Sequence, residues 1–174
     1  AQTQGNLDKG FHAIKMKVGR ARLSEDVERV SAMRELLGPN FPLMADANMR
    51  WSTDQAIAAA DALEKFGLFW LEEPIVPEDL AGHARLGQET RVPIATGENL
   101  HSVHEFEHLM AYGHVDFPEP DAATLGGITP WIEVAKIAQD RGLPVTSHGI
   151  HDVHVHLLAG VPNASYLEVH GFGL

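Results

Sequence analysis

Short apolar segments alternate with longer amphipathic segments from one end of the chain to the other. The apolar segments lie at 12–18, 42–46, 68–72, 94–97, 117–121, 144–148 and 166–169. Several are apolar at consecutive positions, as in parallel strands that are buried on both faces. Strands that alternate with helical segments are typical of βαβ units. The pattern therefore predicts an α/β protein with a parallel sheet.

The amphipathic segments carry helix start and stop signals. Ser24, followed by two acids, is the predicted N-cap of a helix that runs to residue 37, and Ser52 or Thr53 is the predicted N-cap of the next helix. Gly67 and Gly113 follow apolar periodic segments as stop signals. The predicted helices are 24–37, 54–66, 102–112, 130–141 and 151–159.

The chain has 174 residues, and no linker or low-complexity segment interrupts it. We therefore expect one domain, residues 1–174. A closed (β/α)₈ barrel takes about 250 residues, so a chain of this length predicts an incomplete barrel.

Each predicted strand ends at or near an ionisable residue. In order, these residues are Lys15 and Lys17, Asp46, Glu72, Glu98, Asp121, His148 and Glu168. From Lys17 onward they are 20 to 29 residues apart, about one strand and one helix. Parallel strands place their carboxyl ends on one edge of the sheet, so these side chains should gather on one rim.

Carboxylates that meet on a partly buried rim repel one another unless a cation neutralises them. Asp46, Glu72 and Glu98 follow three successive strands and offer oxygen ligands only. The chain has no cysteine, which excludes thiolate ligands. Oxygen ligands favour Mg²⁺, with Mn²⁺ as the alternative.

Six motifs carry a resemblance to a known family. They are A-I-K-M-K-V-G (13–19), M-A-D-A-N (44–48), W-L-E-E-P (70–74), I-A-T-G-E (94–98), P-D-A-A-T-L-G-G-I-T (120–129) and S-H-G (147–149). In this order they resemble the enolase superfamily, and within it the mandelate racemase and muconate lactonizing enzyme family. The resemblance implies a modified TIM barrel of the (β/α)₇β type. It also implies that the family's N-terminal capping domain and first barrel strand are absent from this sequence.

The resemblance implies roles for the rim residues. Asp46, Glu72 and Glu98 match the ligands of the essential Mg²⁺. Lys17 matches the acid/base on one face of the substrate, and Lys15 matches the lysine beside the substrate carboxylate. A neighbouring lysine and a cation would lower the pKa of Lys17 toward neutrality, as a general base requires.

His148 and Asp121 match the dyad that works on the opposite face of the substrate, and Glu168 matches an acid that hydrogen-bonds the developing intermediate. Removal of a proton next to a carboxylate builds up negative charge, which a divalent cation stabilises. The resemblance implies an enediolate intermediate, formed by a Lys or His base and stabilised by Mg²⁺.

Dehydration of a sugar acid to a 2-keto-3-deoxy acid is the activity we expect, which makes the chain a lyase. Racemisation or epimerisation of a 2-hydroxy acid stays open, because protonation from the second face would give it. A truncated fragment that binds metal and catalyses nothing is the third alternative. The family's habit further implies a homo-oligomer in the full-length form.

Two acids near the rim have uncertain directions. Glu119 stands where the family pattern leads us to expect glutamine. It could point inward, where it would perturb the dyad, or outward as a surface residue. Glu73 follows Glu72 on one strand, so we expect it on the opposite face, in an ion pair with a helix.

Three histidines after His148 raise the question of a second metal site. His151, His154 and His156 lie at i, i+3 and i+5, which does not place all three on one helical face. A pocket-lining role for His151 is the more plausible interpretation.

The formal net charge of −11 argues against nucleic acid and anionic membranes as partners, because these attract clusters of Lys and Arg. We expect a small-molecule carboxylate as substrate. The absence of cysteine and of an apolar N-terminal signal favours the cytoplasm.

Overall fold

The computed structural model describes residues 2–169 and has the predicted alternation of strands and helices. Its strands are β1 (Ile14–Lys17), β2 (Leu43–Asp46), β3 (Trp70–Glu72), β4 (Ile94–Thr96) and β5 (Phe117–Pro118). They form one parallel sheet in sequential order, β1 to β5.

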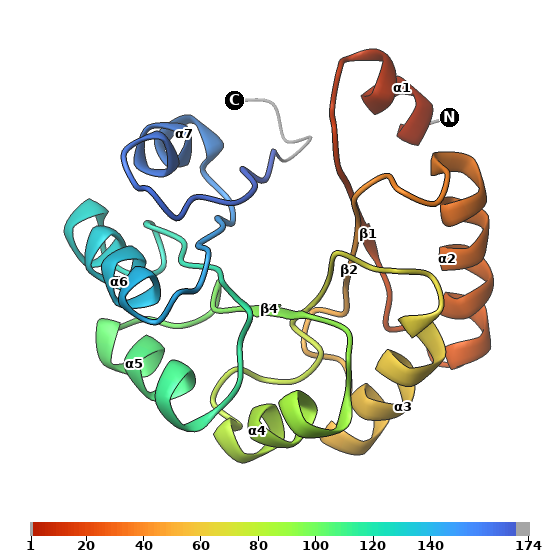
Figure 1. Cartoon of the computed structure of the whole chain (residues 1–174), viewed down its shortest axis with the longest axis horizontal. Helices are drawn as coiled ribbons and strands as arrows, with labels where there is room; N and C mark the ends of the chain where they lie inside the picture. The colour runs from red at the N-terminus through yellow and green to blue at the C-terminus, as the bar shows by residue number, and fades with distance from the viewer. Residues whose placement is uncertain (1, 170–174) are drawn as a thin grey trace.

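The helices lie outside this sheet. They are α1 (Gln2–Asp8), α2 (Leu23–Leu37), α3 (Thr53–Glu64), α4 (Leu80–Glu89), α5 (Val103–Tyr112), α6 (Ile128–Asp140) and α7 (His151–Ala159). Figure 1 shows them as an arc around the strands, with α1 and α7 on either side of its open part. Within residues 2–169 the fold is thus an incomplete α/β barrel, as the sequence predicts.

Two predicted strands were wrong. Within the described residues, segments 144–148 and 166–169 contain no strand, and Val145 and Ala164 form an isolated parallel bridge. Proline has no N–H to donate, so Pro118, Pro120 and Pro144 each remove one possible ladder donor from β5 and the segment beside it. Segment 144–148 still follows β5, because Thr146 N donates to Pro118 O at 3.0 Å.

Helix ends follow the predicted signals at Ser52 in α3 and at Gly113 in α5, and depart from the prediction in α2. Ser52 and Gln55 form a reciprocal capping box at α3, and Ser102 accepts from Glu105 N at α5. Helix α2 begins one residue before Ser24, and its N-cap is Arg22, which makes no side-chain cap bond. The prediction of Ser24 as N-cap was wrong, and helices α1 and α4 were not predicted.

The core lies between the sheet and the helices. The four residues of β2 are fully buried, which explains their apolar pattern on both faces. Inside the arc, Trp70 packs against Phe117 with ring centroids 5.0 Å apart, and Phe69 packs against Tyr166 at 5.2 Å. These aromatic rings form a floor beneath the carboxyl ends of the strands.

Candidate active site

The carboxyl ends of the strands bring the predicted rim residues together. Lys17 is the last residue of β1, Asp46 of β2 and Glu72 of β3. The parallel register places Lys17 opposite Asp46 and Asp46 opposite Glu72. The rim is therefore a direct result of strands that end in step.

A cavity of about 470 Å³ opens between β1 and residues 166–169. Its lining includes Lys15, Lys17 and Glu168 from the predicted set, together with Trp70 and Tyr166 from the aromatic floor. This cavity combines an apolar base with charged walls, which is typical of a binding site for a small polar molecule.

Two lysines pair with acids on this rim. Lys15 Nζ lies 2.5 Å from Glu168 Oε1 and also pairs with Glu72, while Lys17 pairs with Asp46. Burial lowers the pKa of Lys15, but the charges of Glu119, Glu72 and Glu168 outweigh it and raise the pKa well above its usual range. Lys15 is thus held as a cation.

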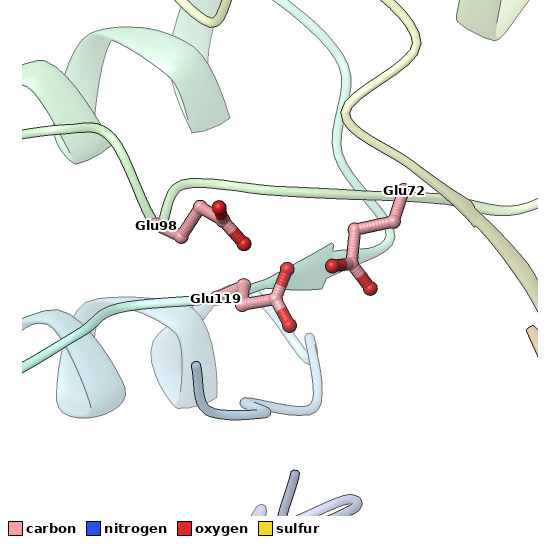
Figure 2. A group of neighbouring side chains, drawn as sticks. All are labelled: Glu72, Glu98 and Glu119. Atoms are coloured by element: carbon pink, nitrogen blue, oxygen red, sulfur yellow. The ribbon is translucent and has the colours of Figure 1, made fainter. Parts of the chain in front are cut away.

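The carboxylates of Glu72, Glu98 and Glu119 form a compact group. One oxygen from each lies within 4.8 Å of the others, and Figure 2 shows the three side chains pointing toward one another. Burial raises the pKa of Glu72 to about 8, and burial likewise raises the pKa values of Glu98 and Glu119. The three acids thus make ionisation of one another costly, because they share a largely buried space.

Asp46 stands beside this group. Its Oδ1 accepts from Asn48 N at 2.8 Å, which fixes the carboxylate at the end of β2. Its charge helps to raise the pKa of both Glu72 and Glu98, so it lies within electrostatic reach of the predicted ligands.

The predicted dyad is formed. His148 Nδ1 lies 3.0 Å from Asp121 Oδ2, and Asp121 Oδ1 accepts from Ala123 N at 2.7 Å. A carboxylate only accepts, so Nδ1 carries a proton and Nε2 faces Glu98, 3.4 Å from its Oε2. Burial lowers the pKa of His148, but the bond to Asp121 and the charge of Glu98 prevail and raise it.

Glu119 takes one of the two directions that the sequence left open, and Glu73 differs from its predicted position and partner. Glu119 points inward, toward Glu72 and Glu98. Glu73 is fully buried and accepts from Asn99 Nδ2 at 2.7 Å, so the predicted ion pair with a helix was wrong. The backbone of Glu73 has a φ of 40°, which breaks the strand alternation on which the prediction depended.

His154 is a residue of the site region whose role could not be predicted from the sequence. It is fully buried on α7, and its Nε2 accepts from Ala122 N at 3.0 Å, next to Asp121. His154 therefore fixes the segment that carries the dyad carboxylate. Within residues 2–169, the potential metal-binding group found contains none of the histidines.

The carboxylate group meets the chemical needs of Mg²⁺. Its donors are hard oxygens, which Mg²⁺ prefers, and several of them lack protein partners in the described part of the chain. An unpaired buried carboxylate is costly, and a divalent cation removes that cost. The residues present thus fit the cation that the sequence predicts.

The parallel βα arc and its acidic rim define the class of protein to which the chain belongs. Residues 1–173 match the Enolase C-terminal domain-like family. The chain is a member of this family, within the enolase superfamily, and the resemblance seen in its motifs is confirmed.

Similar proteins act on acid sugars. The chain is 54% identical over 165 residues to 3,6-anhydro-alpha-L-galactonate cycloisomerase of Streptomyces coelicolor, covering 95% of this chain and 46% of that protein. It is 42% identical over 161 residues to L-talarate/galactarate dehydratase of Salmonella typhimurium, covering 92% of this chain and 40% of that protein.

A solved structure shares the fold closely. A racemase from Streptomyces coelicolor A3(2) with bound magnesium has a TM-score of 0.96 and 51% identity, covering 97% of this chain and 51% of that chain. The chain thus spans about half the length of its relatives. Within residues 2–169, no helix is long and apolar enough to cross a membrane.

Proposed function

We propose that this chain is the barrel domain, residues 1–174, of a Mg²⁺-dependent enzyme that removes the proton next to the carboxylate of a sugar acid and then expels the oxygen on the adjacent carbon. The observation that carries the proposal is the chain of contacts along the rim: Lys15, which lines the cavity beside Lys17, pairs with Glu72 of the carboxylate group, and Glu98 of that group lies 3.4 Å from His148 of the dyad. The relatives are acid-sugar enzymes, which supports the substrate class.

The proposed cation ligands are Asp46, Glu72 and Glu98. Mg²⁺ held by them would supply positive charge to the substrate carboxylate and stabilise the charge that develops when the proton leaves. Lys15, which stays cationic between Glu72 and Glu168, would bind and orient the same carboxylate. The role of Glu168 is to hold Lys15 in place and to hydrogen-bond the developing intermediate.

Lys17 is the proposed base. Its side chain lines the cavity and is 61% exposed, so its Nζ can reach a bound substrate. Its ammonium pairs with Asp46 at the end of the neighbouring strand. A cation bound by Asp46 would release Lys17 from this pair.

His148 is the proposed acid. Asp121 orients its ring through Nδ1, and Nε2 is the nitrogen that would hand a proton to the departing oxygen. The raised pKa of His148 favours the protonated ring that this step needs. The lyase assignment follows when the departing group is a hydroxyl, because water then leaves the substrate.

The cycloisomerase relative favours a second candidate of the same chemistry. In a 3,6-anhydro sugar acid, the oxygen on the carbon two positions from the carboxylate carbon belongs to an ether ring. Expulsion of that oxygen opens the ring and loses no atoms, so the enzyme is an isomerase. The same proton removal thus serves both reactions, and the leaving group decides between them.

Product analysis in D₂O tests the proposal. The purified protein with Mg²⁺ is incubated with galactarate, talarate and 3,6-anhydro-L-galactonate, and NMR and mass spectrometry follow each acid. We expect a 2-keto acid with deuterium at C3, formed with loss of water from the first two substrates or as an isomer of the third. Lys17→Ala and His148→Ala should abolish it.

Deuterium at C2 without a keto product would instead identify a racemase or epimerase, and would refute the elimination. Binding of Mg²⁺ with no turnover of any acid would support the metal-binding fragment.

A further inference from the structure

Glu119 is the buried acid of the site for which the proposed function has no role. It follows β5 directly, and its N–H donates to Thr96 O at 3.0 Å, so its backbone is fixed beside β4. Its side chain is fully buried and turns into the interior of the arc, toward Glu72 and Glu98 (Figure 2).

Neither carboxylate oxygen of Glu119 has a hydrogen-bond partner within residues 2–169. Oε2 of Glu98 is also without a hydrogen bond there, and its 3.4 Å contact with His148 is longer than one. A buried carboxylate without partners destabilises the folded protein unless a proton or a cation removes the charge.

The geometry favours a cation. Oxygens bound to one hard cation at 2.0–2.6 Å lie up to about 4 to 5 Å apart, and the three glutamates offer oxygens within 4.8 Å of one another. Glu72 is engaged by Lys15 and by Trp70 Nε1, the latter at 2.9 Å. Glu119 makes no hydrogen bond or ion pair among the described residues, and Lys15 acts on it only through its charge, so both of its oxygens are available to a cation.

We propose that Glu119 is a direct ligand of the divalent cation, together with Glu72 and Glu98. The inference rests on the proposed function only in assuming that the rim holds a cation, and it requires no particular substrate. It adds an acidic ligand at a position where the family pattern leads us to expect a neutral glutamine. The extra charge should make the cation site of this chain tighter than one with glutamine there.

Calorimetric titration of the purified protein with MgCl₂ tests this proposal without reference to activity. Glu119→Gln keeps the shape of the side chain and the hydrogen-bonding ability of a neutral acid, and removes the charge. We expect it to weaken Mg²⁺ binding at least tenfold.

Glu73→Gln is the matched control. Glu73 is an equally buried acid near the rim, and Asn99 holds its Oε1. Its charge acts on the cation only from a distance, so this variant should change the affinity less than threefold. Glu119→Asp keeps the charge and draws it back by one methylene, and should also weaken binding if direct contact matters.

Wild-type affinity in Glu119→Gln and Glu119→Asp would refute the role of Glu119 and leave the proposed function intact. Such a result would mean that Glu119 stays neutral beside the cation. A wild-type protein that binds no Mg²⁺ would instead refute both this inference and the cation of the proposed function.

Discussion

Gly149 should hold the dyad in place through its lack of a side chain. It follows His148, has a φ of +80°, and a Cβ there would overlap Asp121 Oδ2. Asp121 is only 5% exposed, so its carboxylate has little room to move away. Gly149→Ala should therefore push Asp121 off His148.

Gly142 provides the matched control. Its φ is +71°, and a Cβ there would meet nothing within 4 Å. Gly142→Ala should thus cost only the left-handed backbone conformation, about 1 kcal/mol. Gly149→Ala should cost the same amount plus one hydrogen bond to a charged group, about 2.5 to 4 kcal/mol in total.

Urea unfolding of the two variants measures this difference. The proton on His148 Nδ1, seen by NMR, should remain in Gly142→Ala and shift or vanish in Gly149→Ala. Equal stability losses in the two variants, with the His148 signal unchanged in both, would refute the argument.

Three further predictions concern stability. Ser52→Ala should lose about 1 kcal/mol of unfolding free energy in urea, because it removes the capping box of α3. Ser24→Ala should change this free energy by less than about 0.5 kcal/mol, because Ser24 caps no helix, and equal losses in the two variants would contradict the prediction. Burial raises the pKa of Glu73 to about 7, so the stability that its neutral form contributes is full below about pH 4.5 and is lost as the pH rises through 7. The urea midpoint of Glu73→Gln should therefore fall less than that of the wild type over this pH range. Parallel curves for the two proteins would show the reasoning to be wrong. Burial lowers the pKa of His83 from 6.5 to about 4, so the stability that its neutral ring contributes is lost as the pH falls through 4. His83→Leu should therefore resist acid unfolding better than the wild type. Acid unfolding of His83→Leu at a higher pH than the wild type would count against this prediction.

The sequence predicts site and helix positions correctly where strand ends and helix caps are decided by neighbouring residues. Asp46 and Glu72 end apolar segments, and parallel strands that end in step bring such residues together. The capping box at Ser52 and the glycine after Tyr112 likewise act within one helix turn, so their effect is readable from neighbours in the chain.

The direction of two acids could not be read in this way. Prolines flank Glu119, so strand alternation gives no dependable direction there, and its environment depends on β3 and β4. The positive φ of Glu73 arises at the turn that follows β3 and leaves no sequence signal of its own. Segments 144–148 and 166–169 have strand-like residues but make few ladder hydrogen bonds, which composition does not reveal.

Helix α4 was missed although a signal was present. Asp79 is the N-cap of α4, and its side chain accepts a hydrogen bond from Gly82 N. Leu86 is one of the buried residues of this helix. His154 was missed for a different reason, since its bond to Ala122 N joins residues that are far apart in the chain.

The most direct test of the account follows the C2 proton of a sugar acid in D₂O as Mg²⁺ is added to the purified protein. The account predicts that the C2 proton signal disappears only when Mg²⁺ is present and that a chelator stops this loss. In Lys17→Ala the C2 proton signal should persist at every Mg²⁺ concentration. Loss of the C2 proton that persists in the chelator, or in Lys17→Ala at the wild-type rate, would contradict the central claim.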